Sequence, residues 1–204
     1  MSDTTTNWSA VADVLDEGWV LHLGVTSSHH GTLVLPMLYV RDEQSLLLHG
    51  AVGNEILRDL GDGSVVSATV TLLDGLVVAR SAFQSSVAYR CVMMRGTLNA
   101  LEGADREAAL MRITDSLIPG RRDEIRESSN GEVRATVVLR YQLTDATLRT
   151  SPLEVGDAPS DQGAAVWAGV IPLRVVAGEP AVATDVPDGV EVPVSVRTWR
   201  PPRS

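Results

Sequence analysis

The sequence predicts a mainly β protein with flanking helices, folded as an antiparallel barrel, and three observations support this fold class. Short stretches of alternating apolar and polar residues recur along the chain, separated by turn-forming residues. Helical spacing occurs at residues 7–17, 54–60 and 104–117, without regular alternation with the strands. No Gly-x-Gly-x-x-Gly sequence follows a strand, which disfavours a doubly wound nucleotide-binding fold.

The first expected helix spans Asn7–Glu17, after a polar, frayed segment at residues 1–6. Asn7 is a suitable N-cap, and Gly18 suits the position just after the helix. A strand is expected over 19–26, a hairpin turn over 27–31 and a return strand over 32–40. Because proline has no N–H group, Pro36 predicts an edge position or a bulge in the return strand.

The middle of the chain predicts further strands around one short helix. A turn at 41–44 leads to a buried strand at 45–49, a helix at 54–60 that residues 61–63 end, and a Val- and Thr-rich strand at 64–73. The stretch from Val70 to Gly96 holds two apolar runs around a polar middle. It predicts two paired strands with functional groups at their junction, the second ending near Leu101.

The last third begins with a helix at 104–117, which Pro119 and Gly120 end. A polar loop or short helical turn at 121–131 precedes the clearest strand, at 132–143. A loop at 152–163, a final strand at 164–176 and a proline-rich extended arm at 178–204 complete the chain. We therefore expect a barrel domain over residues 1–150, with 151–204 packed on it as a loop, a closing strand and an arm.

Composition limits the classes of function. The 204 residues are 44% hydrophobic and 21% charged, which suits one globular domain. The net charge of −9 argues against nucleic acid as a partner. All 17 basic side chains are arginine, so Schiff-base chemistry and a Walker-type lysine are excluded. A single cysteine, the absence of a leader-like N-terminus and the interrupted apolar runs predict a cytoplasmic protein that does not associate with membranes.

Two arginines lie on the strands of the Val70–Gly96 stretch. A buried guanidinium needs an anionic partner, because an unpaired charge costs several kcal/mol to bury. Arg80 and Arg90 therefore predict either a phosphate or carboxylate ligand or an internal ion pair, for which Asp74, Asp42 and Glu43 are the candidates.

The order of these elements and several motifs resemble one family. The motifs are Leu-Leu-Leu-His-Gly at 46–50, Thr-Val-Thr-Leu-Leu-Asp-Gly at 69–75, Arg-Ser-Ala-Phe at 80–83, Tyr-Arg at 89–90 and Val-Trp-Ala-Gly-Val-Ile-Pro-Leu at 166–173. The chain is similar to the FMN-binding split-barrel proteins related to pyridoxamine 5′-phosphate oxidase, in the branch that contains the 5-nitroimidazole reductases.

This resemblance implies a six-stranded split barrel and a homodimer with two FMN molecules at the subunit interface. It places the flavin against residues 36–41 and 48–51, and the phosphate against residues 52–58. The expected cofactor-binding residues are Pro36, Leu38, Tyr39, Leu48, His49, Gly50, Ala51, Asn54, Arg58, Arg80, Ser81, Tyr89 and Arg90.

The phosphate segment departs from the family pattern. Glu55 stands where relatives carry a basic residue, and its negative charge opposes phosphate binding. The helix N-terminus and Arg58 are the alternative donors.

The histidines have different expected roles. His49 is the expected catalytic residue, as a proton donor or substrate contact at the flavin, and a structural, hydrogen-bonded histidine is the alternative. We expect His22 to be a hydrogen-bonded barrel residue, and His29 and His30 to lie in a solvated turn. No metal site is expected, since defined ligand geometry is lacking.

The resemblance implies an FMN-dependent oxidoreductase that reduces a small organic substrate, such as a nitroaromatic compound. A nicotinamide cofactor or another reductant would supply the electrons. The alternatives are a non-catalytic flavin- or haem-binding protein on the same scaffold and a re-purposed, cofactor-free member.

Overall fold

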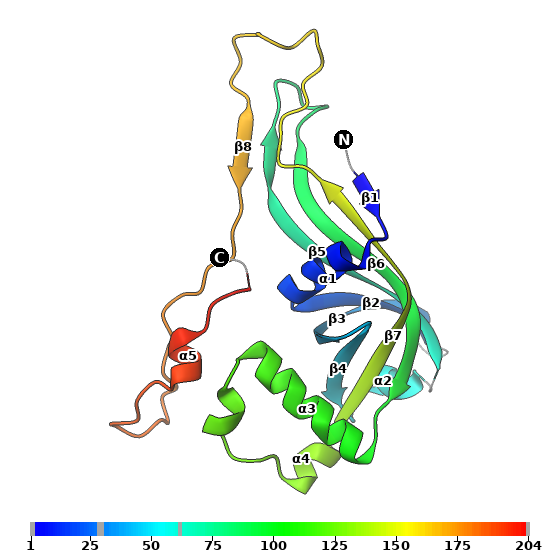
Figure 1. Cartoon of the computed structure of the whole chain (residues 1–204), viewed down its shortest axis with the longest axis vertical. Helices are drawn as coiled ribbons and strands as arrows, with labels where there is room; N and C mark the ends of the chain where they lie inside the picture. Colours follow the sequence, from blue (N-terminus) through cyan, green and yellow to red (C-terminus); the bar gives the residue numbers. More distant parts are fainter. Residues whose placement is uncertain (1–2, 28–30, 61–62, 203–204) are drawn as a thin grey trace.

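The computed structural model describes residues 3–27, 31–60 and 63–202. Figure 1 shows a rolled antiparallel sheet with helices on its outside and a long C-terminal segment that leaves it. The strands are β1 (Asp3–Thr5), β2 (Val20–Ser27), β3 (Gly31–Asp42), β4 (Ser45–Ala51), β5 (Ser64–Val78), β6 (Ser86–Ala100), β7 (Thr136–Ser151) and β8 (Gly169–Pro172). The helices are α1 (Trp8–Glu17), α2 (Glu55–Asp59), α3 (Gly103–Leu117), α4 (Asn130–Arg134) and α5 (Val194–Thr198), with a 3-10 turn, η1, at Arg121–Glu124.

Six strands form a closed ring in the order β7-β4-β3-β2-β5-β6, because β6 also pairs with β7. The short strands β1 and β8 add to β7 and β5 on the outside of this ring. The mainly β fold class and the six-stranded barrel predicted from the sequence are therefore confirmed.

The barrel is split between β3 and β4. These strands pair only from Tyr39 to Asp42 on β3 and from Ser45 to Leu48 on β4. Beyond that point β3 pairs with β2, and β4 pairs with β7. Pro36 lies in the part of β3 that pairs with β2 alone, so the predicted edge position is confirmed.

The core fills the barrel and is closed at one end by α1. Val11 and Leu15 of α1 are almost completely buried, and the Tyr39 hydroxyl donates a hydrogen bond to the Leu15 carbonyl at 2.7 Å. Gly18 does not adopt the left-handed conformation expected after a helix, since its φ is −82°. Glycine is needed for space instead, because a Cβ would lie 2.6 Å from the Tyr39 hydroxyl oxygen.

A second, smaller core lies outside the barrel, under α3. Ala109 and Ile113 of α3 pack on Val40, Leu47 and Val138 of the sheet. The predicted helix at 104–117 therefore exists and covers the outer face of β3, β4 and β7.

Several predicted boundaries are wrong. Residues 3–5, expected to fray, pair with β7, and the strand expected to end at residue 73 continues to Val78 through a bulge at residue 74. The strand expected to start at 132 starts at Thr136, because residues 130–134 form α4 behind a Ser129 capping box. The expected closing strand at 164–176 is reduced to the four residues of β8. The turn at 28–30 and the break at 61–62 lie outside the described residues.

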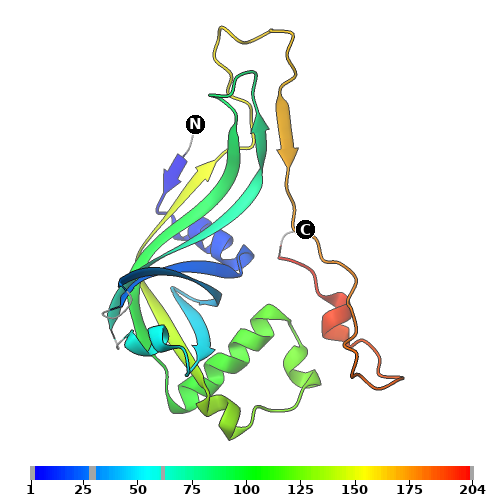
Figure 2. The ribbon, with the colours of Figure 1, turned by 180° about the vertical axis from the view of Figure 1, so that it is seen from behind.

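The predicted extended arm at 178–204 is interrupted by α5 and is therefore only partly extended. From here on, the C-terminal arm means the longer described segment, residues 164–202, which also contains β8. It runs along the outer end of β5 as β8 and then forms α5 (Figure 2). Trp199 docks it back on the rest of the chain: its Nε1 donates to the Leu117 carbonyl of α3 at 2.7 Å, and its ring lies 5.6 Å from that of Trp19, just before β2. The Ser195 amide and hydroxyl also donate to the Glu124 carboxylate.

Candidate functional site

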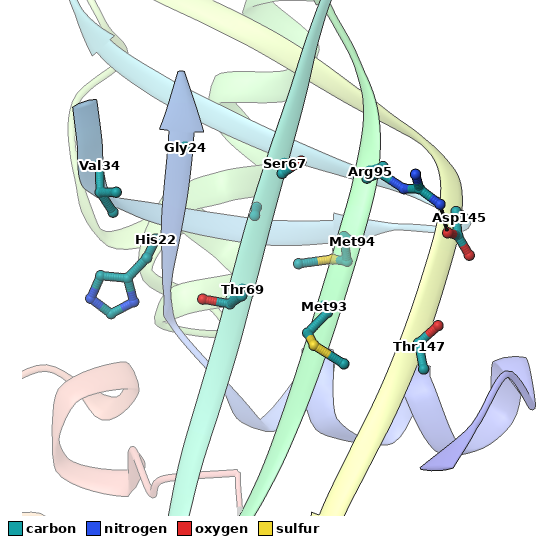
Figure 3. Close-up of a pocket in the computed structure, with 11 residues that line it drawn as sticks. His22, Gly24, Val34, Ser67, Thr69, Met93, Met94, Arg95, Asp145 and Thr147 are labelled. Atoms are coloured by element: carbon teal, nitrogen blue, oxygen red, sulfur yellow. Dashed lines mark hydrogen bonds and ion pairs between the residues drawn. The ribbon is translucent and has the colours of Figure 1, made fainter. Parts of the chain in front are cut away.

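The outer face of the sheet carries an uncovered hollow beside the part that α3 covers. In the register of the strands, His22 of β2 lies opposite Thr69 of β5, Thr69 opposite Met93 of β6, and Met93 opposite Thr147 of β7. These side chains form a row across four strands, and they border a hollow of about 430 Å³ (Figure 3). That volume lies within the range of small-molecule pockets.

The hollow is mostly apolar and has a charged rim. Gly24 and Ser67 form its small-residue floor, and Val34 borders it with a side chain that is 64% exposed. Arg95 and Asp145 form an ion pair of 2.6 Å at one side. His22 itself is exposed and has no hydrogen-bond partner within the described residues, so the expected hydrogen-bonded barrel histidine is wrong.

A second candidate region borders the split between β3 and β4. Pro36 and Leu38 come from β3, and His49 and Ala51 from β4, at the point where the two strands diverge. The Nδ1 atom of His49 is buried and has no hydrogen-bond partner among the described residues. Burial lowers the pKa of His49 and so favours its neutral imidazole. A neutral imidazole can either donate a hydrogen bond to a ligand or accept one from it.

Three of the predicted flavin contacts are enclosed by the protein. The side chains of Tyr39 and Leu48 fill the barrel core and are at most 2% exposed, so they cannot touch a ligand in this structure. Burial and the nearby Asp16 carboxylate also raise the pKa of Tyr39. A Cβ at Gly50 would lie 2.4 Å from Leu57, so this residue faces the protein. Alternation along β3 and β4 sends these positions inward, whereas Pro36, Leu38 and His49 point outward.

In the predicted phosphate segment, the N-cap residue of α2 occupies the amide groups that would donate to a phosphate. The Asn54 carboxamide oxygen accepts hydrogen bonds from the Ile56 and Leu57 amides at 3.1 and 3.3 Å. These amides are therefore not open donors for a phosphate. The Arg58 side chain lies outside the described part of the chain.

Arg80 and Ser81 lie at the junction of β5 and β6, as the sequence predicted for polar groups there. The Arg80 amide and guanidinium both donate to the Asp157 carboxylate, whose pKa is lowered by these hydrogen bonds. The Ser81 carbonyl accepts from the Ser85 amide and hydroxyl at 3.1 and 2.9 Å, respectively. The structure thus gives Arg80 the internal ion pair, with a partner 77 residues away instead of those expected.

Arg90 also has an internal ion pair. Its guanidinium donates to Glu17 at 2.6 and 2.8 Å and to Asp74 at 2.7 Å, and these bonds raise its pKa. It borders a cleft of about 700 Å³ between the barrel and the arm. The neighbouring Tyr89 is half-buried on β6, opposite Ser151 of β7. A ligand contact for either residue stays a prediction.

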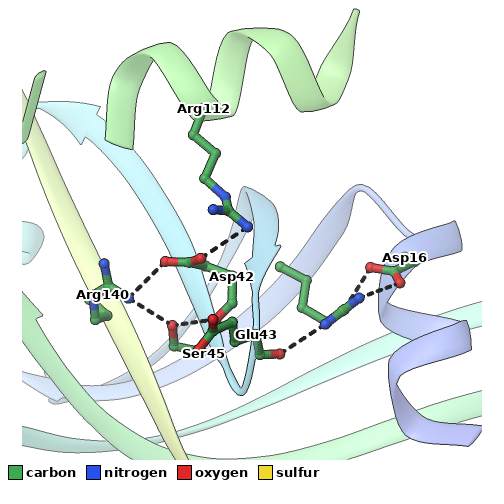
Figure 4. Close-up of polar contacts among 7 residues, drawn as sticks. Asp16, Asp42, Glu43, Ser45, Arg112 and Arg140 are labelled. Atoms are coloured by element: carbon green, nitrogen blue, oxygen red, sulfur yellow. Dashed lines mark hydrogen bonds and ion pairs between the residues drawn. The ribbon is translucent and has the colours of Figure 1, made fainter. Parts of the chain in front are cut away.

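A further polar cluster joins α3 to the sheet. The Asp42 carboxylate accepts from Arg112 of α3 at 3.0 Å and from Arg140 of β7 at 2.8 Å (Figure 4). Arg140 also contacts the Ser45 hydroxyl at 3.2 Å. These contacts stay within the chain and fix α3 over the second core, so we assign the cluster to folding.

No group of three or more His, Cys, Asp or Glu side chains that could hold a metal ion occurs among the described residues. His29 and His30 lie outside that part of the chain. No helix in the described ranges is long and apolar enough to span a membrane.

Comparison with known proteins places this geometry in a family. The sequence matches the family described as pyridoxamine 5′-phosphate oxidase over residues 7–150, which includes the whole closed ring except the last residue of β7. The chain belongs to this family. No curated protein matches it.

Two solved structures resemble nearly the whole chain. The FAD- and haem-binding protein from Mycobacterium smegmatis is 35% identical, with a TM-score of 0.90 and 95% of each chain covered. A flavocytochrome from Azotobacter vinelandii is 27% identical, with a TM-score of 0.88 and coverage of 97% of this chain and 92% of that one. A candidate 5-nitroimidazole antibiotic resistance protein from Bacteroides thetaiotaomicron is 17% identical with a TM-score of 0.61, covers 74% of this chain and 87% of its own, and shares the fold.

Sequence reasoning missed the hollow. The alternation of β2 places His22 on one face, but it does not show which face is covered. Its exposure follows because α3 packs on β3, β4 and β7 only near Val40, Leu47 and Val138, and leaves the hollow uncovered. The usable signal was the small residues Gly24 and Ser67 close to a histidine in the strand pattern.

Proposed function

We propose that this protein is a flavin-dependent oxidoreductase of the pyridoxamine 5′-phosphate oxidase family that also carries haem. The observation that carries the proposal is similarity over nearly the whole chain to two proteins, one that binds FAD and haem and one that is a flavocytochrome. A bound flavin supplies hydride and electron chemistry, and haem supplies one-electron chemistry.

The segment after the barrel favours this proposal over a nitroreductase. The family match ends at residue 150, and the nitroimidazole-resistance candidate covers 74% of the chain. The two flavin- and haem-associated proteins cover 95% and 97% of it, and so most of residues 151–204. The arm is thus a feature that this chain has in common with them.

The residues at the split fit a flavin. His49 is only partly buried, and its imidazole, whose Nδ1 has no hydrogen-bond partner among the described residues, offers a polar contact. Pro36 offers an exposed apolar surface on β3, beside Leu38, which also packs on the second core. His49 would position the polar edge of the ring and hold or pass a proton at Nδ1, since its neutral form can donate or accept. FMN is the flavin that the motifs imply. FAD is the alternative, because the protein that is 35% identical to this chain binds FAD.

Spectroscopy of the purified protein tests this proposal. We expect flavin bands and a Soret band, oxidation of a nicotinamide or another reductant, and one flavin released on denaturation that chromatography identifies as FMN or FAD. Reduction of a nitroaromatic compound tests the expected substrate class. A protein with flavin and no turnover would be a binding protein, and one that rejects FMN, FAD and haem would overturn the proposal.

We also propose that the protein acts as a homodimer, with the arm of each chain covering the other. Eleven of the twenty-two exposed large hydrophobic side chains among the described residues lie between Val166 and Val194. A segment this apolar gains free energy when a second surface covers it. Light scattering should give twice the 21.8 kDa of one chain. Val175→Asp with Val176→Asp should give single chains, and a single-chain wild type would contradict the dimer.

A further inference from the structure

The hollow of β2, β5, β6 and β7 holds an imidazole that the fold does not use. The His22 side chain is exposed there and makes no hydrogen bond with the described residues. No hydrogen bond or ion pair of the His22 side chain with the described residues supports the fold, so its position beside an apolar hollow points to ligand binding.

The residues around His22 indicate which kind of ligand its imidazole can bind. A free metal ion needs several protein ligands, and no cluster of three ligating side chains exists in the described ranges. Haem iron needs only an axial ligand from the protein, because the porphyrin supplies the in-plane nitrogens, and histidine is a common one. A single accessible imidazole therefore fits haem and does not fit a bare ion.

The shape and charge of the hollow agree with this ligand. Gly24 and Ser67 leave room for a flat macrocycle to approach the sheet, and Val34 and Met93 give it apolar contact. Arg95 lies at the rim, where it pairs with Asp145 at 2.6 Å through one nitrogen. Its side chain is 70% exposed, so the remaining N–H donors of its guanidinium can reach the carboxylates of a haem.

We propose that His22 is the axial iron ligand of a haem that binds in this hollow, with Arg95 pairing with its carboxylates. The proposal rests on the proposed function and adds to it the haem-binding site and the residue that ligates the iron. It assigns the haem to His22 and the flavin to His49. Pro36, which borders the flavin region, lies directly opposite His22 in the register of β2 and β3, so the two groups would be neighbours.

Titration of the flavin-loaded protein with ferric haem tests this site. The wild type should develop a Soret band of histidine-ligated haem. His22→Ala should weaken haem binding by about tenfold or more, since loss of even an outer partner of a metal ligand costs that much. Added imidazole should restore the histidine-type spectrum to His22→Ala, because it can occupy the vacated space.

Two further variants control the test. Gly24→Leu should block haem while leaving His22 in place, since a Cβ at Gly24 would meet nothing closer than the Ser67 carbonyl at 3.4 Å. His29→Ala with His30→Ala removes two other histidines and should bind haem as the wild type does. Flavin content and circular dichroism should be the same in all variants.

The outcomes separate the two proposals. If His22→Ala or Gly24→Leu binds haem with the wild-type affinity and spectrum, the hollow is not the site, and this inference is overturned while haem binding stands. If the wild type binds flavin but no haem, the haem part of the proposed function fails, and this inference fails with it.

Discussion

The barrel and the C-terminal arm are built on opposite principles. In the barrel, alternating strands bury residues such as Leu21, Leu46 and Leu48 completely. In the arm, Val175, Val176 and Val182 are 60–75% exposed, and the backbone is held at β8, α5 and Trp199. The difference teaches that the barrel is stabilised by its own contacts, whereas the arm leaves much of its apolar surface uncovered.

The largest expected effect comes from one glycine in the barrel. A Cβ at Gly96 would lie 2.1 Å from the Gln142 carbonyl oxygen of the neighbouring strand, so Gly96→Val forces β6 and β7 apart. We expect this variant to be insoluble or unfolded by circular dichroism. Gly178→Val makes the same change in the arm, where no atom lies within 4 Å of the new Cβ, and it should change stability by less than about 0.5 kcal/mol. Equal behaviour of the two variants would contradict the comparison.

A matched pair of leucines sharpens the comparison with a smaller change. Leu48→Ala leaves a cavity in the core and should lower the free energy of unfolding by about 2–5 kcal/mol. Leu173→Ala, at a position 43% exposed at the start of the arm, should lower it by less than about 1 kcal/mol. Denaturant unfolding measures both, and a larger loss for Leu173→Ala would show that the arm is part of the folding unit.

Arg90 tests whether an ion pair or a ligand explains a charge at the border of the two regions. Arg90→Met leaves Glu17 and Asp74 facing each other without their shared cation, and should cost about 1–3 kcal/mol, since the group is only partly buried. Arg197→Met, in an exposed position of α5, is the control and should have little effect. Loss of flavin with unchanged stability would instead support the ligand role.

The smallest expected effect is pH-dependent and concerns the contact between Ser195 of the arm and Glu124 of η1. Hydrogen bonds from Ser195 hold the pKa of Glu124 below its usual 4.5. Because the pKa of this carboxyl is lower in the folded chain, the carboxylate stabilises the folded state at pH values above its pKa in the unfolded chain. This stabilisation is lost as the pH falls through the carboxyl's pKa in the folded state. The melting temperature of wild type should exceed that of Glu124→Gln at neutral pH, and the two should converge as the pH is lowered below about 4.5. A difference that persists in acid would exclude the carboxylate charge as the cause.

The sequence predicted the barrel better than the site, for a physical reason. Strand alternation is a local signal, so the paired strands and the edge position of Pro36 follow from neighbouring residues. Asp74 was among the partners expected from the sequence, and it does pair with Arg90. Asp157 pairs with Arg80 and Glu17 also pairs with Arg90, from 77 and 73 residues away, and no local pattern indicates these two partners. The length of β5 was missed because the expected strand ended at residue 73, whereas the chain continues to Val78 through a bulge at Asp74.

The arm was the least predictable region. Its residues lack periodicity, since few of them pack against the chain itself, and only the prolines indicated an extended course. The contact that returns it to the barrel depends on Trp199 meeting Trp19 across 180 positions of sequence. Such a contact depends on the whole fold, so no local sequence pattern in either segment predicts it.

Attachment of the arm at both ends has a consequence for assembly. Because β8 holds one end and Trp199 holds the other, the residues between them form a tethered loop whose excursions are limited by its length. Such a loop can close over a neighbouring molecule without unfolding either attachment, so association would need no exchange of strands between chains. Association of two molecules should then be rapid and reversible. Dilution should show little of the hysteresis that domain-swapped oligomers show.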